Sequence, residues 1–160
     1  MGHQNGPVTR IGLVTVVVHQ YDEAVRFYVD ALGFEVVEDT PLGDGRRWVV
    51  ISPPGDRGAA LLLARAATGT QHARVGDQTG GRVSFFLYTE EFSAKYRRMR
   101  AAGVRFVEDP RRETYGTVAV FEDLYGNRWD LIEPNHGCQW ASRKTGRRWR
   151  GVILRLGPCP

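Results

Sequence analysis

The chain has 160 residues and a formal net charge of +4, with 42% hydrophobic and 25% charged residues. This length corresponds to one domain or to two small halves that share a core, and the composition is ordinary for a globular protein. No apolar run approaches the roughly 18 residues that a membrane helix needs, and residues 1–10 lack the apolar core of a secretory signal, so we expect a cytoplasmic protein without a membrane partner.

The positive net charge of the chain comes from its C-terminal residues. Residues 135–160 contain six Lys or Arg residues and no acid, and without them 16 cations stand against 18 acids. Both cysteines, Cys138 and Cys159, also lie there, so the rest of the chain offers no disulfide framework and no Cys-x-x-Cys metal site. The mixture of aromatic and basic residues in this tail is typical of nucleic-acid contacts, but without a folded context we expect a mobile appendage and no nucleic-acid partner.

The predicted elements begin with a strand at residues 11–18, which is rich in β-branched side chains. An amphipathic helix follows; Asp22 and Glu23 suit its positive N-terminus, and Gly33 stands where a helix C-terminal glycine belongs. Three further strands are predicted at residues 34–38, 47–52 and 59–64. The stretch 67–81, rich in Gly, Thr and Gln, is interpreted as a linker.

The second half of the chain repeats this order. A strand at residues 83–88 precedes a helix that carries Phe92, Tyr96 and Met99 at helical spacing and ends near Gly103. Strands are then predicted at residues 104–108, 117–121 and 128–132. The sequence therefore predicts an internal repeat, with module one at residues 10–66, module two at 82–134 and a basic tail at 135–160.

Two motifs carry a resemblance to a known family. The first module contains Ala24, Phe27-Tyr28 and Leu32-Gly33-Phe34, and the second ends in Phe121-Glu-Asp-Leu-Tyr-Gly-Asn-Arg-Trp-Asp-Leu-Ile-Glu-Pro134. Together, in paired modules, they resemble the vicinal-oxygen-chelate superfamily of glyoxalase, bleomycin-resistance and extradiol-dioxygenase proteins. The resemblance implies an α+β fold in which two tandem βαβββ modules form an open β-cup, with the helices packed outside. It also implies a homodimer.

The alternation of side chains along a strand sorts residues between the packed face and the cup. In the first strand we expect Thr15, Val17 and His19 to face the cup. In the second module we expect Ser84, Phe86 and Tyr88 to do so. In the last strand, the resemblance places Asp130 on the side of the cup. Arg128, two residues earlier, should face the same side.

Metal-using members of the family supply His or Gln from the first strand of a module and Glu from its last. In this chain the first-strand ligand position of module one falls on Leu13, and the equivalent position of module two falls on Arg82 or Ser84. The last strand of module one, at residues 59–64, has no carboxylate. Only Asp130 remains, and one carboxylate does not hold a catalytic ion. We therefore expect no cofactor at the family's usual site, with a divalent metal at a rearranged site as the open alternative.

Three functions follow as hypotheses. The leading one is a bleomycin-resistance-type protein that binds a small amphipathic or aromatic molecule in the cup through Thr15, Val17, Ser84, Phe86, Tyr88 and Arg128. The second is an enzyme of the lactoylglutathione-lyase or dioxygenase kind, in which Asp130 and His19 would be the catalytic residues. The third is an interaction module that acts through the tail at residues 135–160. The sequence leaves open whether any reaction is catalysed.

Overall fold

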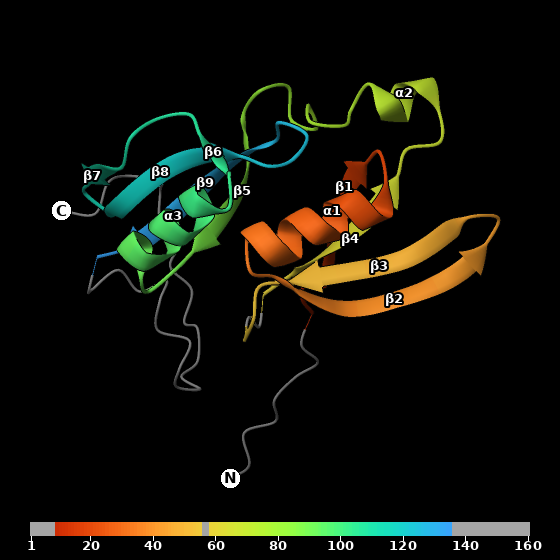
Figure 1. Ribbon diagram of the computed structural model, residues 1–160, viewed down its shortest axis with the longest axis horizontal. Helices are drawn as coiled ribbons and strands as arrows, with labels where there is room; N and C mark the ends of the chain where they lie inside the picture. Colours follow the sequence, from red (N-terminus) through yellow and green to blue (C-terminus); the bar gives the residue numbers. More distant parts are fainter. Residues whose placement is uncertain (1–8, 56–57, 136–160) are drawn as a thin grey trace, which may run out of the picture. The chain divides into compact units, whose positions relative to one another are not determined.

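A computed structural model describes residues 9–55 and 58–135 of the chain. The predicted tail, with Cys138 and Cys159, therefore lies outside the described residues except for Asn135. Contacts between residues divide the chain into two compact units, unit 1 ending at Gln78 and unit 2 beginning at Thr79. Each unit contains one sheet and one main helix, and each is described by itself (Figure 1).

The sheet of unit 1 is mixed and has four strands in the order β1-β4-β3-β2. Their bounds are β1 Leu13–Val18, β2 Glu35–Gly43, β3 Arg46–Ser52 and β4 Ala60–Arg65. Strand β1 pairs with β4 in parallel, whereas β2, β3 and β4 form an antiparallel meander. Among the described strands β1 and β2 are therefore the edges of this sheet.

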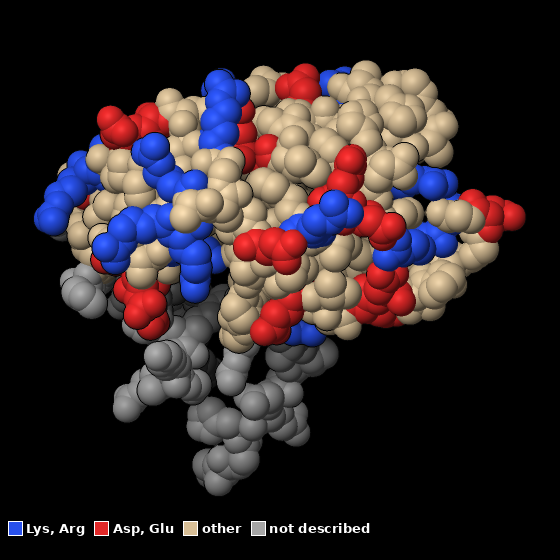
Figure 2. All heavy atoms as spheres, viewed as in Figure 1, with Lys and Arg blue, Asp and Glu red and all other residues tan. Residues whose placement is uncertain are grey.

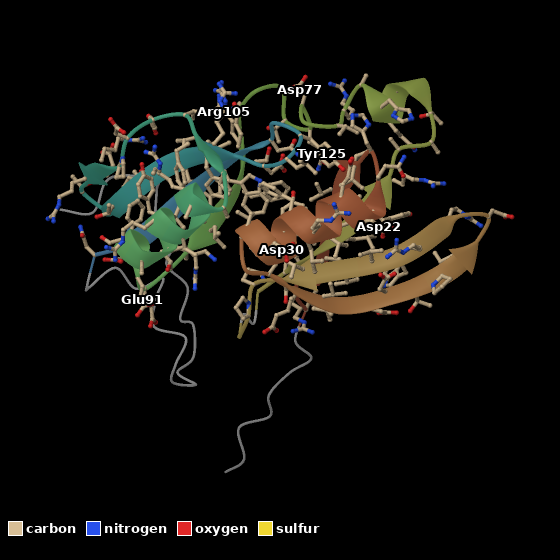
Figure 3. The ribbon with its side chains drawn as sticks, viewed as in Figure 1. Asp22, Asp30, Asp77, Glu91, Arg105 and Tyr125 are labelled. Atoms are coloured by element: carbon tan, nitrogen blue, oxygen red, sulfur yellow. The ribbon has the colours of Figure 1, made fainter. Side chains whose placement is uncertain are left out.

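The main helix of unit 1 lies against one face of the sheet. It begins as α1 (Tyr21–Arg26) and continues as one π-helical turn, η1 (Phe27–Ala31). Asp22 and Asp30 lie on this helix (Figure 3). The helix contacts β2, β3 and β4, and its Tyr28 and Ala24 are buried. The strand residues of this unit with almost no exposed surface are Val16, Val18, Val49, Ile51 and Leu63. Burying apolar area at about 25 cal/mol per Å² stabilises this arrangement.

The predicted linker contains a short helix that the sequence prediction missed. Helix α2 spans Gly69–His72, and the Thr68 hydroxyl caps it by accepting a hydrogen bond from the Gln71 backbone N–H at 3.2 Å. The Gln71 side chain in turn accepts from the Ala67 N–H at 2.7 Å. Because Thr-x-x-Gln is the pattern of a capping box, the sequence did carry a signal for this turn.

Unit 2 repeats the plan with a five-stranded sheet. Its elements are β5 Val83–Tyr88, α3 Phe92–Ala101, β6 Arg105–Phe106, β7 Arg111–Glu113, β8 Gly116–Glu122 and β9 Arg128–Pro134. The order is β5-β9-β8-β6, with β7 also paired to β8, and β5 and β9 run parallel. Phe92 and Met99 of α3 are buried.

The predicted strand at 104–108 is interrupted, and β7 was not predicted. Strands β6 and β7 pair with two successive parts of β8, and the Val107 N–H still donates to the Val120 carbonyl at 2.9 Å. Pro110 follows, and proline has no N–H to donate. The edge strand therefore breaks between β6 and β7 and resumes at Arg111.

The expected fold class is confirmed: the chain has an α+β architecture in which a βαβββ-like module occurs twice and builds two open, mixed sheets. Basic and acidic side chains are interspersed over the face drawn in Figure 2. Within the described residues, no helix is long and apolar enough to cross a membrane.

Candidate functional site

The open face of the unit 2 sheet carries exposed aromatic side chains. Phe85 packs on the buried Trp129 with ring centroids 4.4 Å apart, and Leu87 is buried as well. Phe86 and Tyr88 point to the opposite face, where they remain 56% and 45% exposed. Phe86 and Tyr88 are therefore on the face opposite the packed one, as the alternation along the strand predicts. No described helix of unit 2 covers this face.

Asp130 lies between apolar neighbours on the same face. Strand pairing places Phe86 on one side of it and Val120 on the other. Its Oδ1 atom is buried and has no hydrogen-bond partner among the described residues. Burial raises the pKa of the Asp130 carboxyl above its ordinary value, and the nearby Arg111 cation partly opposes this increase. Asp130 therefore has an unused acceptor beside an exposed aromatic ring.

Arg111, which the sequence analysis missed, extends this face across strand β7. It pairs with Val118 of β8, and its guanidinium forms ion pairs with Glu108 and, at 2.8 Å, with Glu113. Arg111 can act on the charge of Asp130 because the edge strand, which breaks at Pro110, resumes as β7 and pairs with β8. The only signal in the sequence was the alternation Arg111-Arg-Glu113 after a proline, which predicts a short edge strand but not its neighbour.

The turn before β9 is held by one buried carboxylate. Asp123 is 6% exposed, and its Oδ1 accepts hydrogen bonds from the backbone N–H groups of Tyr125, Gly126 and Asn127 at 3.0 to 3.1 Å. Its Oδ2 accepts from the Asn127 amide at 2.9 Å and from the Trp129 indole at 3.3 Å. The turn fixes the start of β9 and hence the position of Asp130 two residues beyond Arg128.

Ser84 and Arg128, both predicted ligand residues, make local contacts near the start of unit 2. The Ser84 hydroxyl lies 2.9 Å from that of Thr79, and the pairing of β5 with β9 is irregular at this point. Arg128 donates from Nη1 to the Gly81 carbonyl at 3.3 Å. Arg128 is an exposed residue, and its role towards a ligand stays a prediction.

The corresponding open face of unit 1 contains Thr15 and Val17. They neighbour Leu62 and Ala64 of β4. The backbone between them is also engaged, because the Gln78 side chain donates to the Thr15 carbonyl at 2.7 Å and accepts from the Val17 N–H at 2.9 Å. Gln78 thus occupies the hydrogen-bonding edge of β1 with its amide group.

His19, the other predicted catalytic residue, lies in unit 1 just beyond the end of β1. Its Nδ1 is 3.4 Å from Nδ1 of His72, the last residue of α2. Asp130 lies in unit 2, so the structure describes the two predicted catalytic residues in separate units. His19 thus contacts a second histidine, which lies in the segment that the sequence analysis interpreted as a linker.

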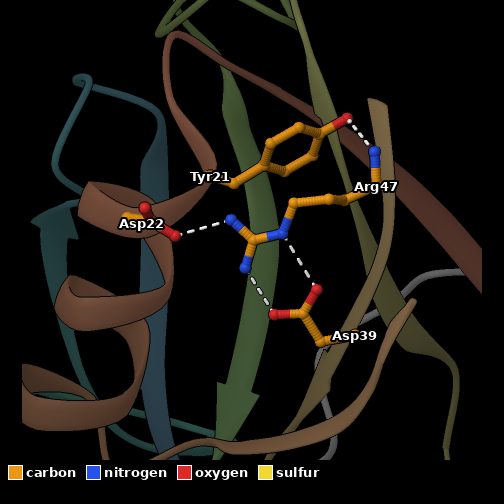
Figure 4. Close-up of polar contacts among 4 residues, drawn as sticks. All are labelled: Tyr21, Asp22, Asp39 and Arg47. Atoms are coloured by element: carbon orange, nitrogen blue, oxygen red, sulfur yellow. Dashed lines mark hydrogen bonds and ion pairs between the residues drawn. The ribbon is translucent and has the colours of Figure 1, made fainter. Parts of the chain in front are cut away.

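Arg47 of β3 contacts two carboxylates and one aromatic ring within unit 1 (Figure 4). Its guanidinium binds both carboxylate oxygens of Asp39 and contacts Asp22 at 2.6 Å. It also lies 5.2 Å from the centre of the Tyr21 ring, and the Tyr21 hydroxyl accepts from the Arg47 backbone N–H at 3.2 Å. The Arg47 guanidinium is therefore paired within unit 1 by Asp39 and Asp22.

Two surface hollows are lined by residues other than Asp130. The larger, about 410 Å³, is formed by α3 and the strand that follows it, and is lined by Tyr96, Arg100 and Phe106 among others. The smaller, about 230 Å³, lies beside the turn end of the β2–β3 hairpin and includes Trp48. The open face around Asp130 is thus a sheet surface within unit 2. We base the candidate site on its chemistry.

The residues at the family's usual metal positions do not form a donor set. Leu13 cannot coordinate an ion, β4 carries no carboxylate, and Ser84 contacts Thr79. Across residues 9–55 and 58–135, no three His, Cys, Asp or Glu side chains come together as metal ligands. Asp130 alone offers one carboxylate, whereas a catalytic divalent ion needs three or more protein donors. No catalytic step through such an ion is derived.

A paired βαβββ architecture with open sheets defines a glyoxalase-like protein, and comparison with known proteins agrees. The sequence model of one protein family, the Glyoxalase/Bleomycin resistance protein/Dioxygenase superfamily, matches residues 10–131. The chain belongs to this superfamily. An uncharacterized protein of Shewanella frigidimarina is 53% identical over 123 residues, which cover 76% of this chain and 91% of that protein.

Two solved structures are similar in both fold and sequence. The structure of UcmS2 has a TM-score of 0.69 and 32% identity, covering 79% of this chain and 98% of that one. TnmS3, an antibiotic binding protein from Streptomyces sp. CB03234, has a TM-score of 0.65 and 27% identity, covering 81% and 99%. Relatives of this chain therefore include a protein that binds an antibiotic.

Proposed function

We propose that this protein binds a small amphipathic molecule with an aromatic part, in the manner of an antibiotic-binding protein, and that the open face of the unit 2 sheet contacts the ligand. The observation that carries this proposal is the Asp130 carboxyl, whose buried Oδ1 has no hydrogen-bond partner among the described residues. A buried acceptor without a partner costs about 1–3 kcal/mol, so a ligand N–H or O–H that reaches it recovers this free energy.

The aromatic side chains supply the apolar part of the contact. Phe86 is adjacent to Asp130 across the β5–β9 pairing and is more than half exposed, and Tyr88 lies two residues further along the same strand. An exposed ring offers a face for stacking, which is worth about 0.5–1.5 kcal/mol beyond the area that it buries. Asp130 would orient the ligand, and Phe86 would supply much of the affinity.

The similarity to TnmS3 supports the ligand class, since that protein is an antibiotic binding protein. We further propose that the protein acts as a homodimer in the cytoplasm. Thr15 and Val17 of unit 1, and Ser84 and Arg128 of unit 2, remain proposed ligand contacts. The proposed tail function of residues 135–160 lies outside the described residues.

A metal-free acid–base enzyme is the second candidate, favoured by one observation. The raised pKa of Asp130 would let this carboxyl hold or release a proton closer to neutral pH than an ordinary aspartate does. Such an enzyme would convert its ligand, whereas a binding protein would release it unchanged. Recovery of the bound molecule and its mass spectrum would separate the two candidates.

The experiment is a binding titration with bleomycin and doxorubicin as probes, followed by tryptophan or doxorubicin fluorescence. We expect Phe86→Ala to weaken binding of whichever probe binds by about tenfold, which corresponds to about 1.4 kcal/mol. The matched control is Tyr115→Ala, because Tyr115 is an aromatic residue of the same unit, 38% exposed, in the turn between β7 and β8. Equal affinities of the Phe86→Ala variant and the wild type would contradict the proposed site.

A further inference from the structure

The segment that follows β4 is fastened along strand β1 at several points. The Ala66 N–H donates to the Val18 carbonyl at 2.9 Å, which continues the parallel pairing beyond the end of β1. Twelve residues later, Gln78 binds the backbone of Thr15 and Val17. Helix α2 lies between these anchors and contacts β1. The position of His72 at the end of α2 is therefore set by the fold of unit 1.

This arrangement brings two imidazole rings together edge to edge. The Nδ1 atoms of His19 and His72 are 3.4 Å apart, while the ring centroids are 5.6 Å apart and the planes differ by 23°. Because the nitrogens are much closer than the centroids, the two Nδ1 atoms lie between the rings. Both side chains belong to exposed residues, so ions in solvent can reach them.

The separation of the two nitrogens suits a shared metal ion. At 3.4 Å the two Nδ1 atoms are within hydrogen-bond distance, at the long end for an N–H donor, and which ring donates depends on the tautomers. Two nitrogen ligands at about 2.0–2.1 Å from a tetrahedral ion lie about 3.3–3.4 Å apart. An ion of this kind would need both rings to turn until their Nδ1 lone pairs meet at the ion, off the line that joins the nitrogens, while the nitrogens keep their separation.

We propose that His19 and His72 form a two-imidazole site for a divalent transition-metal ion of the zinc, nickel or copper class, which fastens α2 to the end of β1. Neutral imidazole is a preferred ligand for these ions. In the part of the chain that the structure describes, no third His, Cys, Asp or Glu completes a larger cluster, so water would fill the remaining positions. The site is separate from the family's usual metal positions and from Asp130.

Bound metal would act as a crosslink between residues 53 positions apart in sequence. An ion that binds the folded state and not the unfolded state stabilises the folded state by mass action. The metal would therefore hold α2, and with it the segment that ends at Gln78, against β1. We expect its role to be structural, because a site with two protein ligands in unit 1 is independent of the proposed ligand face of unit 2.

The test is calorimetric titration of the full-length protein with Zn²⁺. The chain has four histidines and two cysteines, so the reference variant carries His3→Ala, His136→Ala, Cys138→Ser and Cys159→Ser, which leaves His19 and His72 as its only histidines. We expect this variant to bind one equivalent of Zn²⁺, and a further His19→Ala or His72→Ala to weaken binding about tenfold or more, since loss even of groups that only support a metal ligand costs 10–100-fold.

A second readout separates loss of the site from loss of the fold. Zn²⁺ should raise the thermal midpoint of the reference variant, and His72→Gln should abolish this increase while leaving the midpoint without metal and the far-ultraviolet circular dichroism unchanged. Failure of the reference variant to bind Zn²⁺, or binding that is unchanged by His19→Ala and His72→Ala, would overturn the proposal. Neither result would bear on small-molecule binding at Phe86.

Discussion

The side chains of Asp123 and Asn127 are joined by a hydrogen bond in which the Asn127 amide donates to Asp123 Oδ2 at 2.9 Å, inside the turn between β8 and β9. The same carboxylate accepts from three backbone N–H groups and from the indole of Trp129. A single buried side chain thus satisfies the donors of the whole turn. It also fixes the strand that carries Asp130.

We expect Asp123→Ala to destabilise the protein by about 3 kcal/mol, because several N–H groups lose their acceptor and a buried donor without a partner costs about 1–3 kcal/mol. Urea unfolding followed by circular dichroism measures this change. The matched control is Asp109→Ala in the same unit, where an exposed aspartate is removed and the change should stay within about 0.5 kcal/mol. Similar midpoints for the two variants would mean that the turn is organised without Asp123.

The order of elements was predictable from the sequence, because local patterns decide it. Gly33 has a φ of 70° and Gly103 a φ of 83°, and both stand near the ends of the predicted helices. The alternation that exposes Phe86 and buries Leu87 also follows from the period of a strand. Each of these predictions needs only residues within one element and its flanking turns.

The surroundings of the candidate site were not predictable in the same way. Arg111 acts on Asp130 because an edge strand breaks at Pro110 and then resumes beside β8. His72 reaches His19 because the segment between β4 and β5 folds back along β1. Both depend on contacts between segments far apart in sequence, which residue patterns do not specify. The π-helical turn η1 likewise lacks a local signal in the repeat.

Gly116 approaches the neighbouring strand too closely to tolerate a side chain. A Cβ atom at this position would lie 2.2 Å from the backbone oxygen of Glu133. Because backbone cannot move aside as a flexible side chain can, we expect Gly116→Ala to cost about 3 kcal/mol or more of unfolding free energy.

The control for this change is Gly12→Ala, where a Cβ atom would meet nothing within 4 Å. Its thermal midpoint should stay close to that of the wild type. Differential scanning calorimetry of both variants checks the expectation, and a Gly116→Ala protein as stable as the Gly12→Ala protein would show that β8 and β9 can separate locally without cost.

The ion pairs of Arg47 with Asp39 and Asp22 make the stability of unit 1 depend on pH in the acidic range. Hydrogen bonds from Arg47 hold the pKa of the Asp39 carboxyl below its ordinary value of 3.8. A lowered pKa in the folded state means that the stabilisation is present above pH 3.8 and is lost as the pH falls through the folded-state value. Because these side chains are partly exposed, Asp39→Asn should cost less than about 1 kcal/mol at pH 7.

Urea unfolding at pH 7 and at pH 3 measures this effect. The difference between Asp39→Asn and the wild type should shrink at the lower pH. Asp22→Asn is the matched comparison, since Asp22 contacts the same guanidinium but its side chain is 77% exposed, and we expect a smaller change at pH 7. A difference for Asp39→Asn that stays constant between the two pH values would contradict the assigned linkage.

Asp130 should show the opposite dependence, and its replacement should separate stability from binding. Burial raises the pKa of the Asp130 carboxyl above 3.8. The folded state therefore favours the protonated form, and this contribution to stability is present in full below pH 3.8 and is lost as the pH rises through the raised value. Asp130→Asn cannot ionise, so we expect it to exceed the wild type in stability by up to about 1 kcal/mol at pH 7. The two should converge near pH 3.5.

The same variant should bind the probe recognised by the wild type about tenfold more weakly, because it loses the charged acceptor. A gain in stability that accompanies a loss of affinity is the pattern expected when a protein keeps an unfavourable buried group for its ligand. Asp109→Asn, an exposed change in the same unit, should alter neither quantity. If Asp130→Asn binds the probe as tightly as the wild type, the carboxyl does not orient the ligand, and the exposed ring of Phe86 would be left as the basis of the proposed contact.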